Sequence, residues 1–226
     1  MSNPTVFRGG YRGEPAVWLK AGPYEAAVLP EIGANLIALR HTERGCQLLH
    51  EPAEGEMDAF KARPITCGIP VLFPPNRYED GKFTWKGRTY EFPVNEPNRG
   101  NHLHGFLHNI PWTAETMEAN AEQCRVTLVQ HVTEGHPVFT YWPHPFTMRL
   151  TYMLSADGLE QHVWIRNDGD AAMPCMLGFH TAVNAPFAPD GRAEDCLVQL
   201  SIGGRWELNE RMLPTGRMQA LSPKEQ

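Results

Sequence analysis

The chain has 226 residues, of which 42% are hydrophobic and 20% are charged, and its formal net charge at pH 7 is −6. This composition is typical of an ordinary globular protein, and the length predicts a single large domain that spans residues 1–226. The acidic balance argues against a nucleic-acid-binding surface, and no apolar run approaches the roughly 20 residues of a membrane-spanning helix. We therefore expect neither a nucleic-acid partner nor a membrane partner.

The five cysteines predict a reducing compartment. They are odd in number, widely spaced and never arranged as C-x-x-C, so they indicate free thiols and argue against disulfides or a cysteine zinc site. The first ten residues, "MSNPTVFRGG", lack the charged and apolar regions of a secretion signal. We expect the protein to be cytoplasmic.

Alternating apolar and polar side chains predict strands along much of the chain, because side chains on a strand point to opposite faces in turn. In chain order, the predicted strands are residues 15–22, 24–31, 34–41, 124–132, 146–154 and 159–167. Only residues 55–63, "GEMDAFKAR", suggest a turn or two of helix. Many short strands separated by turns favour an all-β fold, either an antiparallel sandwich or a barrel.

Two pairs of strands are expected to form hairpins. Aromatic residues on both sides of Lys86-Gly87 predict a short hairpin over residues 83–92. Asp157-Gly158 is suited to a tight turn and predicts a second hairpin between residues 146–154 and 159–167.

Residues 98–112, "NRGNHLHGFLHNIPW", place His102, His104 and His108 within seven residues. Histidines two apart on a strand face the same side, as in metal-binding cupins, but the glutamate that such a site adds is missing from the following "GFLHNIP". Three interpretations are open for this segment: a metal site, a wall of a sugar-binding site, or an exposed loop. We expect no metal.

The segments around these histidines resemble the aldose 1-epimerase (mutarotase) family. The matching segments, in order, are "GIPVLFPPNR" at 68–77, "GKF" at 81–83, "NEPN" at 95–98, "LHGF" at 103–106, "LGFH" at 177–180 and "LPTG" at 213–216. The resemblance implies the family's antiparallel β-supersandwich. It also implies an isomerase that interconverts the α and β anomers of a free hexose, with a monosaccharide as substrate and no cofactor or metal.

Interconverting anomers requires a base that takes the proton from the C1 hydroxyl and an acid that protonates the ring oxygen, so that the ring opens and recloses. Histidine suits the acid role because its pKa is near 6.5. The resemblance implies that His180 is this acid and that His104 is the second catalytic histidine. It further implies that Arg77 binds sugar hydroxyls, with Asn76 beside it, whereas His102 and His108 orient the loop or lie in solvent.

Each assignment has a simpler alternative. Arg77 could form a surface ion pair with Glu79 or Asp80, and His180 could be a core histidine that is satisfied by the backbone.

The sequence departs from the family pattern at two places. Many relatives have a tyrosine two residues after the acid histidine, where this chain has Ala182. The family's base is a glutamate on a strand after the "LPTG" stretch, and no residue up to Gln226 occupies that position, so we assign no base. We expect a sandwich without its C-terminal strands, completed by a further C-terminal segment or by self-association.

Two alternatives to the epimerase are kept. The missing base favours a non-catalytic carbohydrate-binding domain on the same sandwich. The histidines alone would suit a metal-dependent, cupin-like enzyme.

Overall fold

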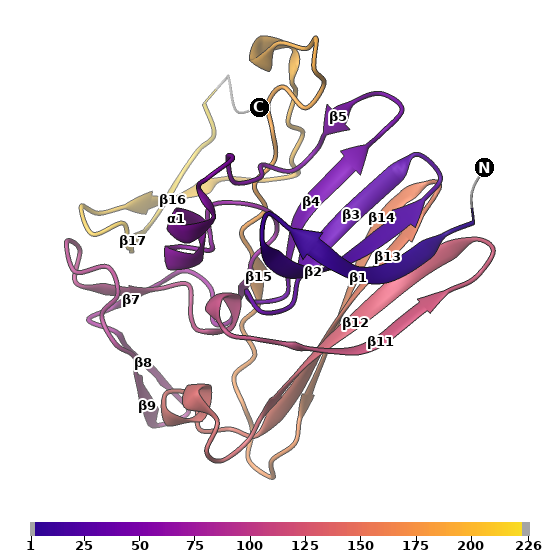
Figure 1. The fold of residues 1–226 in the computed structure, drawn as a ribbon. Coiled ribbons are helices and arrows are strands. Elements are labelled where there is room, and N and C mark those ends of the chain that lie inside the picture. The colour runs from indigo at the N-terminus through magenta and orange to yellow at the C-terminus, as the bar shows by residue number, and fades with distance from the viewer. Residues whose placement is uncertain (1–2, 223–226) are drawn as a thin grey trace.

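Two antiparallel sheets form the body of the protein, which is represented by a computed structural model that describes residues 3–222 (Figure 1). The first sheet has the order β1 (Thr5–Tyr11), β2 (Glu14–Ala21), β3 (Tyr24–Leu29), β4 (Asn35–His41), β5 (Cys46–Gln47). The second has the order β11 (Thr113–Ala119), β12 (Gln123–Val132), β13 (Phe146–Ser155), β14 (Gly158–Asn167). The expected all-β antiparallel sandwich is therefore confirmed.

Shorter ladders join the rest of the chain to these sheets. The pairs are β6 (Val71–Leu72) with β15 (Gly178–Phe179), β7 (Arg77–Glu79) with β10 (Asn101–Leu103), β8 (Lys82–Trp85) with β9 (Arg88–Glu91), and β16 (Arg205–Leu208) with β17 (Pro214–Gln219). The helices are α1 (Met57–Ala62) and three 3₁₀ turns, η1 (Leu107–Asn109), η2 (Pro137–Thr140) and η3 (Ala193–Asp195). Among residues 3–222, no helix is long and apolar enough to cross a bilayer.

The core lies between the two sheets. Along β13, alternate side chains from Phe146 to Leu154 are buried, as the period of two predicts. Tyr152, which is fully buried, donates its hydroxyl to the carbonyl oxygen of Ala34 at 3.1 Å, just before β4. This hydrogen bond ties the second sheet to the first and satisfies a polar group that would be costly to bury alone.

The hairpin predictions have different outcomes. The turn at Lys86-Gly87 is confirmed: Trp85 pairs with Arg88, and both turn residues have positive φ, 47° and 77°. The second hairpin is also confirmed, because β13 pairs with β14, but its predicted turn at Asp157-Gly158 is off by one residue: Ser155 pairs with Gly158 and the loop is residues 156–157. The Ser155 hydroxyl accepts the N–H of Asp157 at 3.2 Å, which closes the turn in this register.

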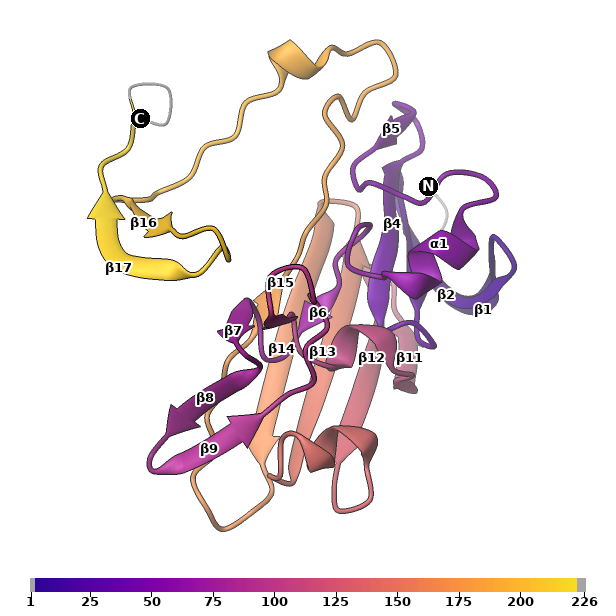
Figure 2. The same ribbon diagram turned by 90° about the vertical axis from the view of Figure 1, so that its left-hand side faces the viewer.

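The C-terminal part of the described chain leaves the sheets. Residues 182–187 still hydrogen-bond to residues 47–50. Beyond them the chain follows a long extended path, and the hairpin β16–β17 lies at one side of the molecule (Figure 2). Large apolar side chains are exposed along this path: Val183, Phe187, Leu197, Val198, Leu200, Ile202, Trp206, Leu208, Met212 and Met218. Such a surface fits the expected self-association, which stays a prediction.

Candidate active site

Two short ladders bring distant segments of the chain to one place. β10 pairs with β7, so that Leu103 lies opposite Arg77, and β15 pairs with β6, so that Phe179 lies opposite Val71. His104 directly follows β10, and His180 directly follows β15. The backbone N–H of His104 donates to Asn76 at 2.9 Å, and that of His180 donates to Pro70 at 3.2 Å.

His104 and His180 face each other across this junction. Their ring centroids are 5.4 Å apart and the rings are inclined at 67°, an edge-to-face arrangement. His104 is partly buried and His180 is exposed. The structure thus brings together the two histidines that the resemblance singled out, with His180 the more accessible of the two.

His104 stays neutral at neutral pH. Burial lowers the pKa of His104 to about 4, and positive charge at His180, His108 and Arg77 acts in the same direction. Its Nδ1 is buried without a hydrogen-bond partner among residues 3–222. A neutral imidazole can donate one hydrogen bond and accept another, which suits contact with a sugar hydroxyl.

Backbone geometry fixes where His104 lies. His104 and Gly105 both have positive φ, 67° and 66°, so the chain turns sharply after β10. Gly105 lies so close to β6 that an added Cβ would be 2.2 Å from the carbonyl oxygen of Phe73. Phe106 then donates its N–H to that same oxygen at 3.1 Å. This approach requires glycine and sets the position of the histidine beside it.

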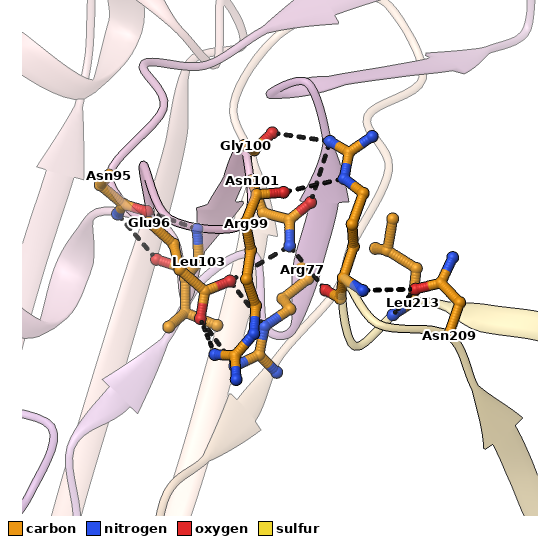
Figure 3. Close-up of polar contacts among 10 residues, drawn as sticks. Arg77, Asn95, Glu96, Arg99, Gly100, Asn101, Leu103, Asn209 and Leu213 are labelled. Atoms are coloured by element: carbon orange, nitrogen blue, oxygen red, sulfur yellow. Dashed lines mark hydrogen bonds and ion pairs between the residues drawn. The ribbon is translucent and has the colours of Figure 1, made fainter.

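Arg77 is held by a carboxylate from the loop before β10 (Figure 3). Its Nε donates to Glu96 Oε2 at 2.8 Å and its Nη2 donates to Oε1 at 2.9 Å, a bidentate ion pair. Among residues 3–222, no acceptor contacts Nη1 of Arg77. The guanidinium is therefore fixed along one edge and keeps a donor nitrogen for a ligand.

Glu96 receives two further hydrogen bonds, from Arg99 Nη1 at 2.9 Å and from Asn101 Nδ2 at 3.1 Å. These donors, Arg77 foremost, lower the pKa of Glu96 to about 2. A carboxylate held in this way is a weak proton acceptor. Glu96 is thus a structural partner of Arg77 and is unsuited to act as a general base.

Three comparisons with known proteins bear on this geometry. The sequence profile of the family described as Aldose 1-epimerase matches residues 15–225. The chain belongs to this family. An uncharacterized relative, YihR of Escherichia coli strain K12, is 29% identical over 203 residues, which cover 88% of this chain and 59% of YihR. The chain thus spans less than two thirds of this curated relative.

Solved structures of aldose 1-epimerase-like proteins share the fold. A galactose mutarotase-like protein from Clostridium acetobutylicum superposes with a TM-score of 0.93 at 33% identity, over 99% of this chain and 67% of that one. A galactose 1-epimerase from Lactobacillus acidophilus superposes with a TM-score of 0.75 at 18% identity, over 98% of this chain and 64% of that one. The mutarotase-type sandwich is therefore shown, and the cupin-like alternative is set aside.

In this epimerase-family chain, His102 and His108 are buried. His102 is 1% exposed, packs against Phe92 and Phe106, and donates from Nδ1 to the carbonyl oxygen of Pro93 at 2.8 Å. His108 is 8% exposed. The expectation that these histidines orient the loop fits this packing, and the alternative that they lie in solvent is wrong.

The ion pair expected as an alternative for Arg77 is also wrong. Glu79 and Asp80 accept hydrogen bonds from Arg211 instead, at 3.0 and 2.7 Å. Asn76 is exposed, has a φ of 66°, and contributes its backbone oxygen to the His104 turn. Within residues 3–222, the histidine, cysteine and carboxylate side chains form no group of three or more that could hold a metal ion.

Sequence reasoning missed Arg211 and the role of Glu96. The signal for Glu96 is the "NEPN" segment at 95–98, which matches the family but does not show which residue its carboxylate binds. Arg211 comes just before "LPTG", and nothing in its sequence neighbourhood indicates a contact with residues 79–101.

The buried histidines predict that stability falls on mild acidification. Burial, the largest cause in each case, lowers the pKa of His102, His104, His108, His136 and His144. Below a pH of about 6.5 the unfolded chain takes up protons that the folded chain still excludes, so the free energy of unfolding decreases as the pH falls from 6.5 towards 4. Urea unfolding at pH 6.5, 6 and 5, above the usual carboxylate range, should show this slope.

The His108→Asn variant isolates one contribution. Because burial lowers the pKa of His108 to about 4, its removal should make the slope shallower by roughly 1 kcal/mol per pH unit. His162→Asn, at an exposed position on β14, is the matched control for the loss of one histidine. An equal slope in wild type and His108→Asn would contradict the prediction.

Proposed function

We propose that the protein is an aldose 1-epimerase that interconverts the α and β anomers of a free hexose. The observation that carries the proposal is the pairing of His104 and His180, with ring centroids 5.4 Å apart, beside a fixed arginine in a chain of this family. The chain spans 59% of its curated relative. The activity is therefore proposed from the geometry of this site and from the family, and is not carried over from that relative.

The proposed roles follow from the accessibility of each group. His180 is exposed and can meet the ring oxygen of a sugar, to which it donates a proton as the ring opens. His104 is neutral and partly buried, so it holds the sugar by hydrogen bonding near the ring. Arg77 presents its free Nη1 to the sugar hydroxyls while Glu96 keeps the guanidinium in place. Asn76 shapes the same turn through its backbone.

The base is assigned to no residue here. Glu96 is excluded because its carboxylate receives four hydrogen bonds and its pKa is lowered to about 2. The family resemblance implies a glutamate on a strand that follows residues 213–216.

The activity is tested by the rate of mutarotation. We expect the protein to accelerate the approach to anomeric equilibrium of fresh α-D-glucose or α-D-galactose, followed by polarimetry and by the anomeric proton signals in NMR. Heat-denatured protein is the control. No acceleration with any aldohexose tested, at enzyme concentrations up to those of the sugar, would refute the activity.

A non-catalytic carbohydrate-binding domain is the second candidate. The observation in its favour is that the carboxylate closest to Arg77 in the contact network, Glu96, is fully engaged and unsuited to proton transfer. Saturation-transfer NMR separates the two functions. Binding of an aldohexose without acceleration of mutarotation indicates a binding domain, whereas binding together with acceleration indicates the enzyme.

A further inference from the structure

The loop of residues 95–103 carries the carboxylate that fixes Arg77, and the loop needs its own support. Asn101 is fully buried, and its Nδ2 donates to Glu96 Oε2 at 3.1 Å and to the backbone oxygen of Arg211 at 2.8 Å. One amide group thus connects the carboxylate of the candidate site with the turn between β16 and β17. Figure 3 shows this connection running from Arg77 to the Asn209 turn.

The side chain of Arg211 binds the same loop from outside. Its Nε donates to the carbonyl oxygen of Arg99 at 2.8 Å, and its Nη2 donates to that of Gly100 at 2.9 Å. The same guanidinium reaches Glu79 and Asp80, at the end of β7 and just after it. Arg211 therefore holds the end of β7 against the loop that carries Glu96, at the end of the β7–β10 ladder where Glu79 pairs with Asn101.

The Arg211 turn is itself ordered by a local cap. Asn209 Oδ1 accepts the N–H of Arg211 at 2.9 Å and the N–H of Leu213 at 3.1 Å. The Arg211 side chain and backbone oxygen both reach the loop of residues 95–103 from this capped turn. The turn therefore offers the loop of residues 95–103 two groups: the Arg211 guanidinium as a donor and the Arg211 backbone oxygen as an acceptor.

We propose that Arg211 is a positioning residue, which fixes the sugar-binding Arg77 through Asn101 and Glu96 and does not itself touch the sugar. The inference rests on the proposed function, because it assigns Arg211 a role in holding a group that binds the substrate. An arginine whose guanidinium donates to two backbone carbonyls and two carboxylates is suited to this task. A small displacement of the loop would rotate Glu96 and turn Nη1 of Arg77 away from the sugar.

Kinetics of the full chain test the proposal. Because Arg77 binds hydroxyls that remain in place throughout the reaction, Arg211→Ala should raise KM about 10-fold and leave kcat within about twofold. Arg211→Lys, which keeps the charge but loses the fork, should be intermediate. Arg217→Ala is the matched control, since Arg217 lies on the same hairpin and pairs with Glu207 only at the surface.

A double-mutant cycle distinguishes positioning from a general structural role. Arg77→Ala should itself raise KM, and adding Arg211→Ala to it should change KM no further, because Arg211 acts through Arg77. A KM increase from Arg211→Ala that persists at full size in the Arg77→Ala background overturns the proposal, and so does an unchanged KM.

Titration of Glu96 provides a readout that needs no activity. In wild type the carboxyl pKa of Glu96 is about 2, and Arg211→Ala should raise it, as followed by carbon-13 NMR, whereas Arg217→Ala should not. If wild type accelerates the mutarotation of no aldose, the proposed function fails and this titration alone decides on Arg211. An unmoved Glu96 in Arg211→Ala then overturns the positioning role.

Discussion

Replacing His180 by asparagine is expected to lower kcat for mutarotation by about 10²- to 10⁴-fold, the contribution that a positioned general acid makes. Asparagine can still form hydrogen bonds, but its amide cannot give up a proton to the ring oxygen. The fold should be unaffected, because His180 is exposed and its described hydrogen bond, to Pro70, comes from the backbone. KM should change little, since Arg77 and His104 still hold the sugar.

The measurement is polarimetry at saturating sugar. His162→Asn, at an exposed position on β14, is the control and should retain wild-type kcat. Unfolding curves for both variants should coincide with that of wild type. An unchanged kcat in His180→Asn would remove His180 from the acid role and leave His104 as the next residue to examine.

The strands that the sequence predicts are those with one buried face. Residues 146–167 alternate clearly because β13 buries every second side chain from Phe146 to Leu154. β1 and β11 have weak patterns, since most of their side chains are exposed or only partly buried. β1 and β11 are strands because they pair with β2 and β12. The pattern of apolar residues within one segment does not show which other segment it pairs with.

The candidate site was predictable in part. The resemblance placed His104, His180 and Arg77 in one site, and the structure brings them together at the β6–β15 and β7–β10 ladders. The partner of Arg77 was not predictable, because Glu79 and Asp80 are closer in sequence than Glu96. The β7–β10 register decides the pairing, and register is a tertiary property.

The buried histidines show the same limit. His102 and His108 are polar and lie in a segment rich in glycine and proline, which favours an exposed loop. In the structure His102 is enclosed by aromatic rings, with one nitrogen bonded to Pro93. Tyr78 on β7, Phe92 just after β9 and Phe106 after β10 supply these rings, and their proximity depends on folding of the whole segment.

Replacing Gly105 by alanine is expected to destabilise the protein by roughly 3 kcal/mol or more, the range of severe core disruptions. An alanine Cβ would lie 2.2 Å from the carbonyl oxygen of Phe73 and 2.5 Å from the nitrogen of Pro74. Both are backbone atoms, so no side chain can rotate to relieve the overlap. The strand end that carries His104 must instead move away from β6, which should also lower kcat/KM.

A control variant, Gly135→Ala, separates the effect of the overlap with the Phe73 backbone from the free-energy cost of placing alanine in a left-handed conformation. Gly135 has a φ of 90° and no atom within 4 Å of its added Cβ, so Gly135→Ala should cost only the roughly 1–2 kcal/mol of the left-handed conformation. Urea unfolding measures both variants. Equal losses would contradict the close approach of Gly105 to β6. A larger loss of stability in Gly105→Ala, with activity reduced in the fraction that remains folded, is the expected result. It would mean that the contact between Gly105 and the backbone of Phe73 helps to place His104 relative to His180, so that both histidines can act on the same sugar ring.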